Sequence, residues 1–143
     1  MGIDLDFLPV LSQWPLLLKG VAWTLGLTAA GALLGLLLGI SCAWAKTEGP
    51  LWGRNLVAAY VEFRNTPFIV QLFFIFFGLP ILGLRLGPEW SSVLAMVINL
   101  GAYSAEIVRA GIQATPTGQV EAAMSLALSR WQTFIWVVLP PAL

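Results

Sequence analysis

Six polar side chains lie inside otherwise apolar segments of this sequence. They comprise carboxylates, a guanidinium, amides and a phenol: Glu62, Arg64, Gln71, Asn99, Tyr103 and Glu106. The last three follow an i, i+4, i+7 spacing, which places them on one helix face. An ionised group in an apolar, membrane-like environment normally faces a bundle interior or an aqueous path. Because the set offers both donors and acceptors, we name these six residues as candidates for a path taken by a zwitterionic or charged solute.

A second interpretation of these groups is structural. Charged side chains near the ends of apolar segments also serve as anchors that reach toward water, which applies to Glu62, Arg64, Glu106 and Arg109. Glu106 and Arg109 are one turn apart and are expected to pair. For Gln71 and Asn99 the alternative is an interhelical hydrogen bond. Arg64 and Gln71 are seven residues apart and are expected to share a helix face, which Gly78 continues.

The composition indicates the environment of these groups. Of 143 residues, 59% are hydrophobic and 10% are charged, whereas soluble domains carry about 25% charged residues. Seven basic and seven acidic residues balance, and the chain has no histidine. These values exclude an ordinary soluble globule and a disordered chain, and they argue against a nucleic-acid partner. The single Cys42 excludes an internal disulfide framework and a thiolate zinc site. The composition therefore predicts a membrane-embedded protein.

The uncharged stretches locate the spans. About 20 apolar residues cross a bilayer as a helix, and the sequence predicts three such helices, at about 21–44, 56–79 and 90–109. Pro67 lies within the second, where it removes a backbone donor and clashes with the carbonyl of Phe63, so we expect a kink or break there. The expected fold is an all-α membrane protein, with residues 1–143 forming one transmembrane domain.

Small residues in the first span form a ridge. Gly31, Gly35 and Gly39 repeat every four residues, and Thr24 and Thr28 extend the same face. Such spacing lets a neighbouring helix approach closely. We interpret the ridge as a packing seam, with a substrate groove as the alternative.

Basic residues in the loops predict the orientation. Lys46, Arg54, Arg109 and Arg130 fall on one side, and Lys19 and Arg85 on the other. The side richer in lysine and arginine is normally cytoplasmic. We therefore expect the N-terminus outside and the segment after the third span in the cytoplasm.

The segment at about 110–140 contains helix signals outside the predicted spans. Thr115 and Pro116 suggest the start of a short helix over about 119–126, and Ser129 with Gln132 fits a capping box. An apolar stripe runs along the short helix: Val120, Ala123, Met124 and Ala127. Because this stripe lies outside the membrane, we expect a partner surface to cover it. The chain contains no phosphate-binding loop and no catalytic constellation, so energy from ATP would have to come from a partner.

This segment resembles the EAA loop of ABC importer permeases. The resemblance rests on Glu121-Ala122-Ala123, Ala127, Val137 and Leu139-Pro140 at the spacing of that loop, which usually has glycine at the position of Ala127 and often isoleucine at that of Val137. Residues 60–74 and 101–111 are similar to the polar amino acid subfamily. The resemblance covers about residues 18–143 and implies a type I permease of the bacterial inner membrane with five spans, so we expect this chain to lack the last two helices.

The resemblance also implies partners and roles. Such permeases pair with a second permease subunit and two ATP-binding cassette ATPase subunits, and an extracytoplasmic solute-binding protein delivers the substrate. ATP would bind to the partner ATPase, so no cofactor and no enzymatic activity are expected on this chain. The EAA loop would form a coupling helix, in which Glu121, Ala122, Ala123, Ala127, Leu139 and Pro140 contact the ATPase or shape the loop. Two other functions compete, a secondary transporter or channel without an ATPase and a membrane scaffold subunit, but neither requires such a loop.

Overall fold

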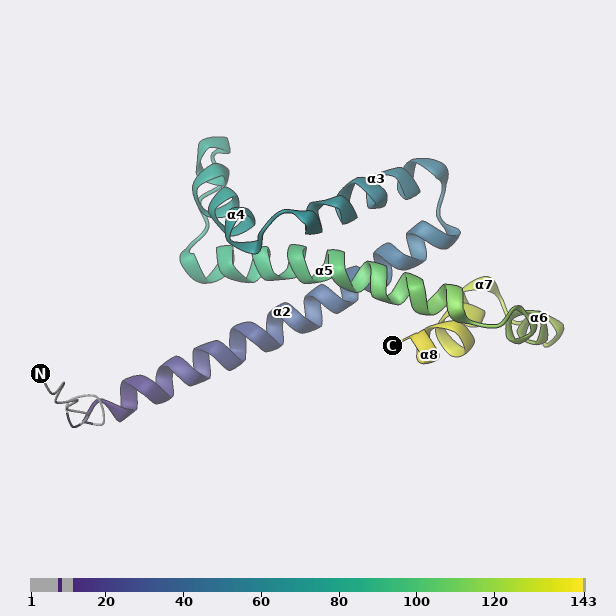
Figure 1. Ribbon diagram of the computed structural model, residues 1–143, viewed down its shortest axis with the longest axis horizontal. Coiled ribbons are helices and arrows are strands. Elements are labelled where there is room, and N and C mark those ends of the chain that lie inside the picture. The colour runs from purple at the N-terminus through teal and green to yellow at the C-terminus, as the bar shows by residue number, and fades with distance from the viewer. Residues whose placement is uncertain (1–7, 9–11, 143) are drawn as a thin grey trace, which may run out of the picture.

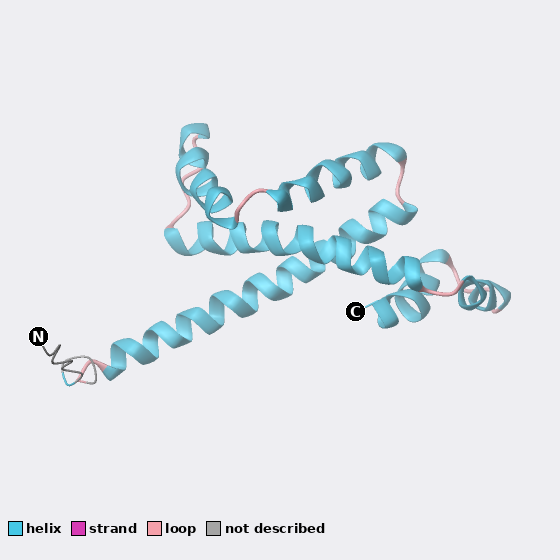
Figure 2. Ribbon diagram, in the orientation of Figure 1, coloured by secondary structure: helices cyan, strands magenta, loops and turns pink. Residues whose placement is uncertain are grey.

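The computed structural model describes Leu8 and residues 12–142, and this part of the chain is helical without any strand (Figures 1 and 2). The predicted all-α fold is therefore confirmed. In chain order the elements are α2 (Trp14–Glu48), α3 (Leu51–Glu62), η1 (Phe63–Asn65), α4 (Phe68–Phe73), η2 (Phe74–Gly78), η3 (Leu79–Leu82), α5 (Pro88–Ala114), α6 (Thr117–Ser125), α7 (Arg130–Thr133), η4 (Phe134–Val138) and α8 (Leu139–Ala142).

Among the described residues, two helices are long and apolar enough to cross a membrane, α2 and α5, and the bent pair formed by residues 51–82 makes a third span if it is counted as one. Helices α2 and α5 both extend beyond the predicted spans, because polar and charged residues such as Lys46 and Gln113 continue the helix past the apolar segment. Helix α2 ends where Gly49 turns away and donates its backbone N–H to the carbonyl of Ala45. The following Pro50 cannot continue the helix.

Helices α2 and α5 cross and pack through small residues (Figure 1). Gly31, Gly35 and Gly39 are buried, and they face α5 residues that are themselves four apart, Met96, Leu100 and Ser104. A methyl group on Gly39 would collide with the Ser104 side chain. The glycine ridge is therefore a packing seam, as predicted. The seam does not extend to Thr24 and Thr28, which are exposed.

The second predicted span is not one helix. The segments Leu51–Asn65 and Phe68–Leu82 meet at a bend of 111°, with Pro67 in the short break between them. We call this bend the elbow, residues 62–67. The expected break at Pro67 is confirmed, but the expectation of a face shared by Arg64, Gln71 and Gly78 is wrong, because the helix does not continue through the elbow.

The segment after α5 forms a protruding helix, α6, and an arm that folds back toward α5 (Figure 1). We call residues 129–142 the returning arm. Thr115 does not cap α6: it ends α5, where its hydroxyl donates to the carbonyl of Gly111, and Pro116 occupies the N-cap of α6. The capping box of Ser129 and Gln132 is confirmed. The arm that follows returns to α5, where Gly111 lies against Ala142 without room for a side chain.

Candidate solute path and coupling loop

Gln71 organises the elbow from α4. Its side chain is 2% exposed, and Nε2 donates to the carbonyls of Phe63 at 2.9 Å and Thr66 at 3.1 Å. Pro67 has no N–H to offer the Phe63 carbonyl, which accepts instead from the Thr66 N–H at 3.0 Å, and the Val70 N–H donates to Pro67 rather than to Thr66. Unpaired carbonyls are costly in an apolar environment. Gln71 therefore gives the Thr66 carbonyl a partner and the Phe63 carbonyl a second one.

Two candidates on α5 complete this contact. Asn99 donates from Nδ2 to the Gln71 Oε1 at 3.3 Å, and the Tyr103 hydroxyl donates to the backbone carbonyl of Arg64 at 3.3 Å. The interhelical hydrogen bond expected as one possibility for Gln71 and Asn99 is present. The structure thus brings Gln71, Asn99 and Tyr103 together, although they come from two elements 28 or more residues apart.

Tyr60 is a further polar contact that the sequence analysis did not single out. Its hydroxyl donates to the carbonyl of Ile98 on α5 at 2.6 Å. The sequence gives one hint of this contact, because a buried tyrosine hydroxyl normally finds a hydrogen-bond partner. Tyr60 fixes the last turns of α3 against α5.

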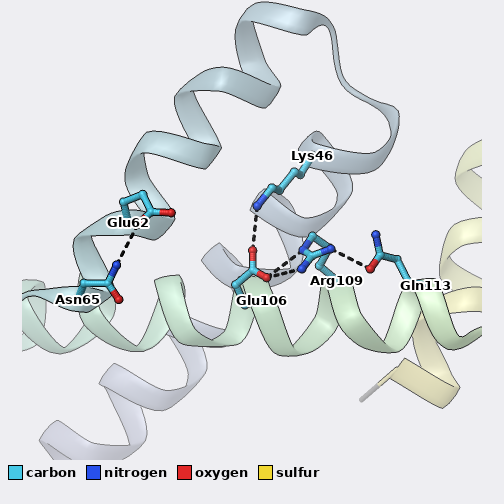
Figure 3. A network of polar contacts seen from close by, with 6 residues as sticks. All are labelled: Lys46, Glu62, Asn65, Glu106, Arg109 and Gln113. Carbon is cyan, nitrogen blue, oxygen red and sulfur yellow. Dashed lines mark hydrogen bonds and ion pairs between the residues drawn. The ribbon is translucent and has the colours of Figure 1, made fainter.

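Glu106 lies in a separate ion network near the C-terminal end of α5 (Figure 3). Its carboxylate accepts from Lys46 Nζ at 2.8 Å and from Arg109 Nη2 at 2.6 Å and Nε at 2.9 Å. Arg109 also donates to Gln113. The expected pairing of Glu106 with Arg109 is confirmed. Lys46, which in the sequence indicates only the orientation, joins the end of α2 to α5.

Glu62 and Arg64 have different environments. Glu62 is exposed and accepts from Asn65 Nδ2 at 2.9 Å (Figure 3). Arg64 is half-buried, and its guanidinium has no hydrogen bond or ion pair within residues 12–142. Of the six candidates, Arg64 is therefore the one charged group that the described part of the chain leaves unpaired.

Helix α6 presents the proposed coupling motif. Glu121 and Ala122 are exposed, whereas Ala123 is 3% exposed. Val120 and Met124 line a pocket of about 630 Å³ between α6, the end of α2 and the returning arm. The expectation that a partner covers the whole stripe is thus wrong for Ala123, because the protein's own arm folds beneath it.

The turn after α6 explains the unusual residue of the motif. Ala127 has a φ of 57°, in the left-handed region. The N–H of Leu128 bonds to the carbonyl of Ala123, and the N–H of Ala127 bonds to that of Met124. These two bonds form a Schellman motif, whose left-handed position favours glycine. The glycine usual in the EAA loop therefore matches the geometry of this position.

Leu139 and Pro140 lie apart from the exposed face of α6. Leu139 is half-buried and Pro140 is exposed, and together they begin α8. The π-helical turn η4 precedes them and packs beneath α6. Their place indicates a role in seating the returning arm on α5.

The comparisons with known proteins agree on the family. Residues 31–143 match the family model described as "Binding-protein-dependent transport system inner membrane component". The chain is 36% identical to the glutamine transport system permease protein GlnP of Escherichia coli (strain K12), over 99% of this chain and 66% of that protein. It is 38% identical to the arginine transport system permease protein ArtQ of Bacillus subtilis (strain 168), over 98% of this chain and 65% of that protein.

Two solved structures are also similar. The first is a crystal structure of an amino acid ABC transporter with histidines, with a TM-score of 0.83 and 37% identity, covering 98% of this chain and 66% of that one. The second is the MetNI methionine ABC transporter in inward-facing conformations, with a TM-score of 0.69 and 26% identity, covering 89% of this chain and 62% of that one. The chain thus spans slightly less than two thirds of these relatives. It belongs to the family of inner membrane components of binding-protein-dependent transport systems.

Proposed function

We propose that this chain forms the solute path of an ATP-driven importer for polar amino acids and couples to an ATPase through α6. The main support is the exposed face of α6, where Glu121 and Ala122 stand clear of the bundle. Leu126 follows α6 and lies outside the candidate spans, yet its apolar side chain is 77% exposed. An apolar side chain in that position is suited to burial in a partner.

The contacts that attach α6 to the bundle would allow its movement to be transmitted to the long helices. Helix α6 follows α5 after two residues, and the returning arm ties it to α2 through the Glu48–Arg130 ion pair at 3.4 Å. The rings of Trp44 and Trp131 add an edge-to-face contact with centroids 5.5 Å apart. A movement of α6 would therefore be passed to both long helices. In the proposed complex, ATP binds to and is hydrolysed by the partner ATPase, a second permease subunit completes the path, and a solute-binding protein delivers the amino acid.

Substitutions at two neighbouring alanines, Ala122 and Ala123, test the coupling role of α6. Replacing exposed Ala122 with tryptophan places a large side chain on the docking face, so we expect loss of ATPase co-purification and of stimulated ATP hydrolysis, with normal protein yield. Glu121→Lys should weaken the same contact by reversing its charge. Asn55→Trp, at an exposed position on α3, is the control and should behave as wild type.

Ala123→Trp separates docking from folding. Because Ala123 is buried by the returning arm, this variant should lower the stability of the permease itself, by overpacking. Normal complex formation and hydrolysis by Ala122→Trp would refute the coupling role.

The proposed orientation places α6 in the cytoplasm and the N-terminus outside. The C-terminal ends of α2 and α5 lie at the end of the bundle that carries α6 (Figure 1), together with Lys46, Arg54, Arg109 and Arg130. A Ser129→Cys variant should react with an impermeant maleimide only after the cells are opened. A Ser12→Cys variant should react in intact spheroplasts, and the reverse pattern would contradict this orientation.

A further inference from the structure

We propose that the ion pair between Lys46 and Glu106 is a positioning contact for coupling, an inference that rests on the proposed function. The pair would hold α2 and α5 in one arrangement, so that both helices move together when a partner moves α6. Lys46 Nζ donates to the Glu106 carboxylate at 2.8 Å, and Arg109 donates to the same carboxylate (Figure 3). We call these three residues the clamp.

The first support is the position of the clamp along α5. Tyr103, which contacts the elbow, precedes Glu106 by about 4.5 Å, at a rise of 1.5 Å per residue. Ala114 is the last residue of α5 and lies about 12 Å beyond Glu106 at the same rise. Helix α6 begins three residues later, at Thr117. The clamp therefore lies between the helix that would receive the movement and the contact that fixes the elbow.

The second support is the contrast with the rest of the contact between α2 and α5. The glycines of α2 that face α5 are Gly31, Gly35 and Gly39, which offer no side chain for a directional bond. Within residues 12–142, Lys46 and Glu106 form the one ion pair that joins the two helices. A partly buried ion pair can select one arrangement of the elements that it joins. Here it would fix the position of α2 along α5.

The third support is the strength of the clamp relative to the other ion pair of α2. Glu48 pairs with Arg130 of the returning arm at 3.4 Å, and the Arg130 side chain is 87% exposed. The Lys46 and Glu106 side chains are 27% and 16% exposed, and their charged atoms are 2.8 Å apart. Exposed ion pairs contribute little to stability, because water and salt screen them. The clamp is therefore the stronger ionic contact at the end of α2.

The fourth support is the hydrogen bonding of Glu106, which the sequence names as a candidate for the solute path. Its carboxylate accepts one hydrogen bond from Lys46 and two from Arg109. An ionised carboxylate offers about four acceptor sites, so most of its capacity is used within the protein. Glu106 is therefore better suited to hold the two helices together than to bind the ammonium group of a solute.

Coupling is tested by the number of ATP molecules hydrolysed for each amino acid taken up. The complete transporter, with its ATPase and binding protein, is reconstituted in proteoliposomes and supplied with radiolabelled L-glutamine or L-arginine, whichever the wild type transports. Lys46→Met removes the charge at similar side-chain length. It leaves Glu106 paired with Arg109, so the permease should fold with normal yield.

The ratio of ATP to solute should rise in Lys46→Met. We expect an increase of about fivefold or more, as for the loss of an allosteric coupling between two sites. Hydrolysis continues in this variant because the docking face of α6 is intact, whereas its movement is passed less completely to α2. The KM for the solute should stay at the wild-type value, because no group that binds the solute is changed.

Three further substitutions separate charge pairing from other effects. Lys46→Arg keeps a cation within reach of Glu106 and should retain most of the coupling. Lys46→Gln keeps a hydrogen-bond donor without the charge, so it should give an intermediate ratio, and it serves as the test if Lys46→Met is produced poorly. Lys19→Met is the same change at an exposed position of the same helix and should match wild type.

Three results would overturn the assignment of the clamp. They are a wild-type ratio of ATP to solute in both Lys46→Met and Lys46→Gln, a changed KM for the solute with an unchanged ratio, and an equal rise of the ratio in Lys19→Met. If the wild type couples hydrolysis to uptake in these experiments, the proposed function stands and only the role of the clamp fails. Wild-type uptake that does not depend on ATP would instead refute the proposed function.

Discussion

At the scale of single residues, most polar side chains around the elbow form hydrogen bonds with the backbone or with one another, and one does not. Gln71 satisfies the carbonyl of Thr66 and Tyr103 that of Arg64, both of which the break leaves without a helical partner. Asn99 holds the Gln71 amide in position. Arg64 alone keeps an unpaired charge among these residues. The break in this helix is thus stabilised by side-chain hydrogen bonds from α4 and α5.

Ala127 offers a residue-scale prediction. A left-handed alanine costs about 1–2 kcal/mol relative to its usual conformations, whereas glycine adopts that region freely but loses about 0.5–1 kcal/mol more chain entropy. Ala127→Gly should therefore raise the free energy of unfolding, by up to about 1 kcal/mol. Denaturant titration of the purified protein, followed by tryptophan fluorescence, measures the change.

The matched control for this change is Ala122→Gly. Ala122 is exposed within α6 and has ordinary helical geometry, so the control should lose about 1 kcal/mol. If both glycine variants were destabilised alike, the left-handed turn would not be a source of strain.

The sequence predicted the roles of some of these residues but not of others, for physical reasons. Features that depend on neighbouring residues were predicted correctly. The capping box at Ser129 depends on four consecutive residues, and a proline such as Pro67 breaks a helix whatever its surroundings. Contacts between distant segments were harder, since nothing local to Lys46 indicates that it meets Glu106, 60 residues away. The role of Gln71 is not predicted by the sequence because the Thr66 carbonyl loses its helical partner only where the chain bends.

At the scale of elements, the α2–α5 pair is the rigid part of the bundle. The glycine ridge lets the two helices approach closely in the middle, and the Lys46–Glu106 ion pair joins them toward their C-terminal ends. Close packing of small residues stabilises helix pairs in lipid, where no hydrophobic driving force brings the helices together. The broken helix α3–α4 is held to α5 by fewer, polar contacts.

Gly39 provides the element-scale prediction. A methyl group there would meet the Ser104 side chain and the α5 backbone, so Gly39→Ala should separate the helices and cost about 1–3 kcal/mol. Thermal unfolding in detergent, read by loss of tryptophan fluorescence, should show a lower midpoint.

Gly26 is the control within the same helix. Nothing lies within 4 Å of a methyl group at Gly26, so Gly26→Ala should be neutral or stabilising by up to about 1 kcal/mol, through helix propensity. Equal effects of the two substitutions would contradict the proposed seam.

At the scale of the whole molecule, continuous structural contacts connect the exposed helix α6 to the proposed solute path. Helix α6 follows α5 directly, the returning arm joins α2 and α5, and α5 carries the contacts that fix the elbow. Rocking of α6 by a partner would therefore move the elements on which Arg64 is positioned. This connection suits alternating access driven by rigid-body movement.

Uptake into proteoliposomes shows whether the permease works with an ATPase. The vesicles contain the permease with its ATPase, the binding protein is added outside, and radiolabelled glutamine, arginine and cystine are offered in turn. We predict uptake of at least one of these amino acids that requires ATP inside the vesicles and continues when ionophores collapse every ion gradient. Uptake that needs no ATP and stops with the ionophores would contradict the account, because it would identify a secondary transporter.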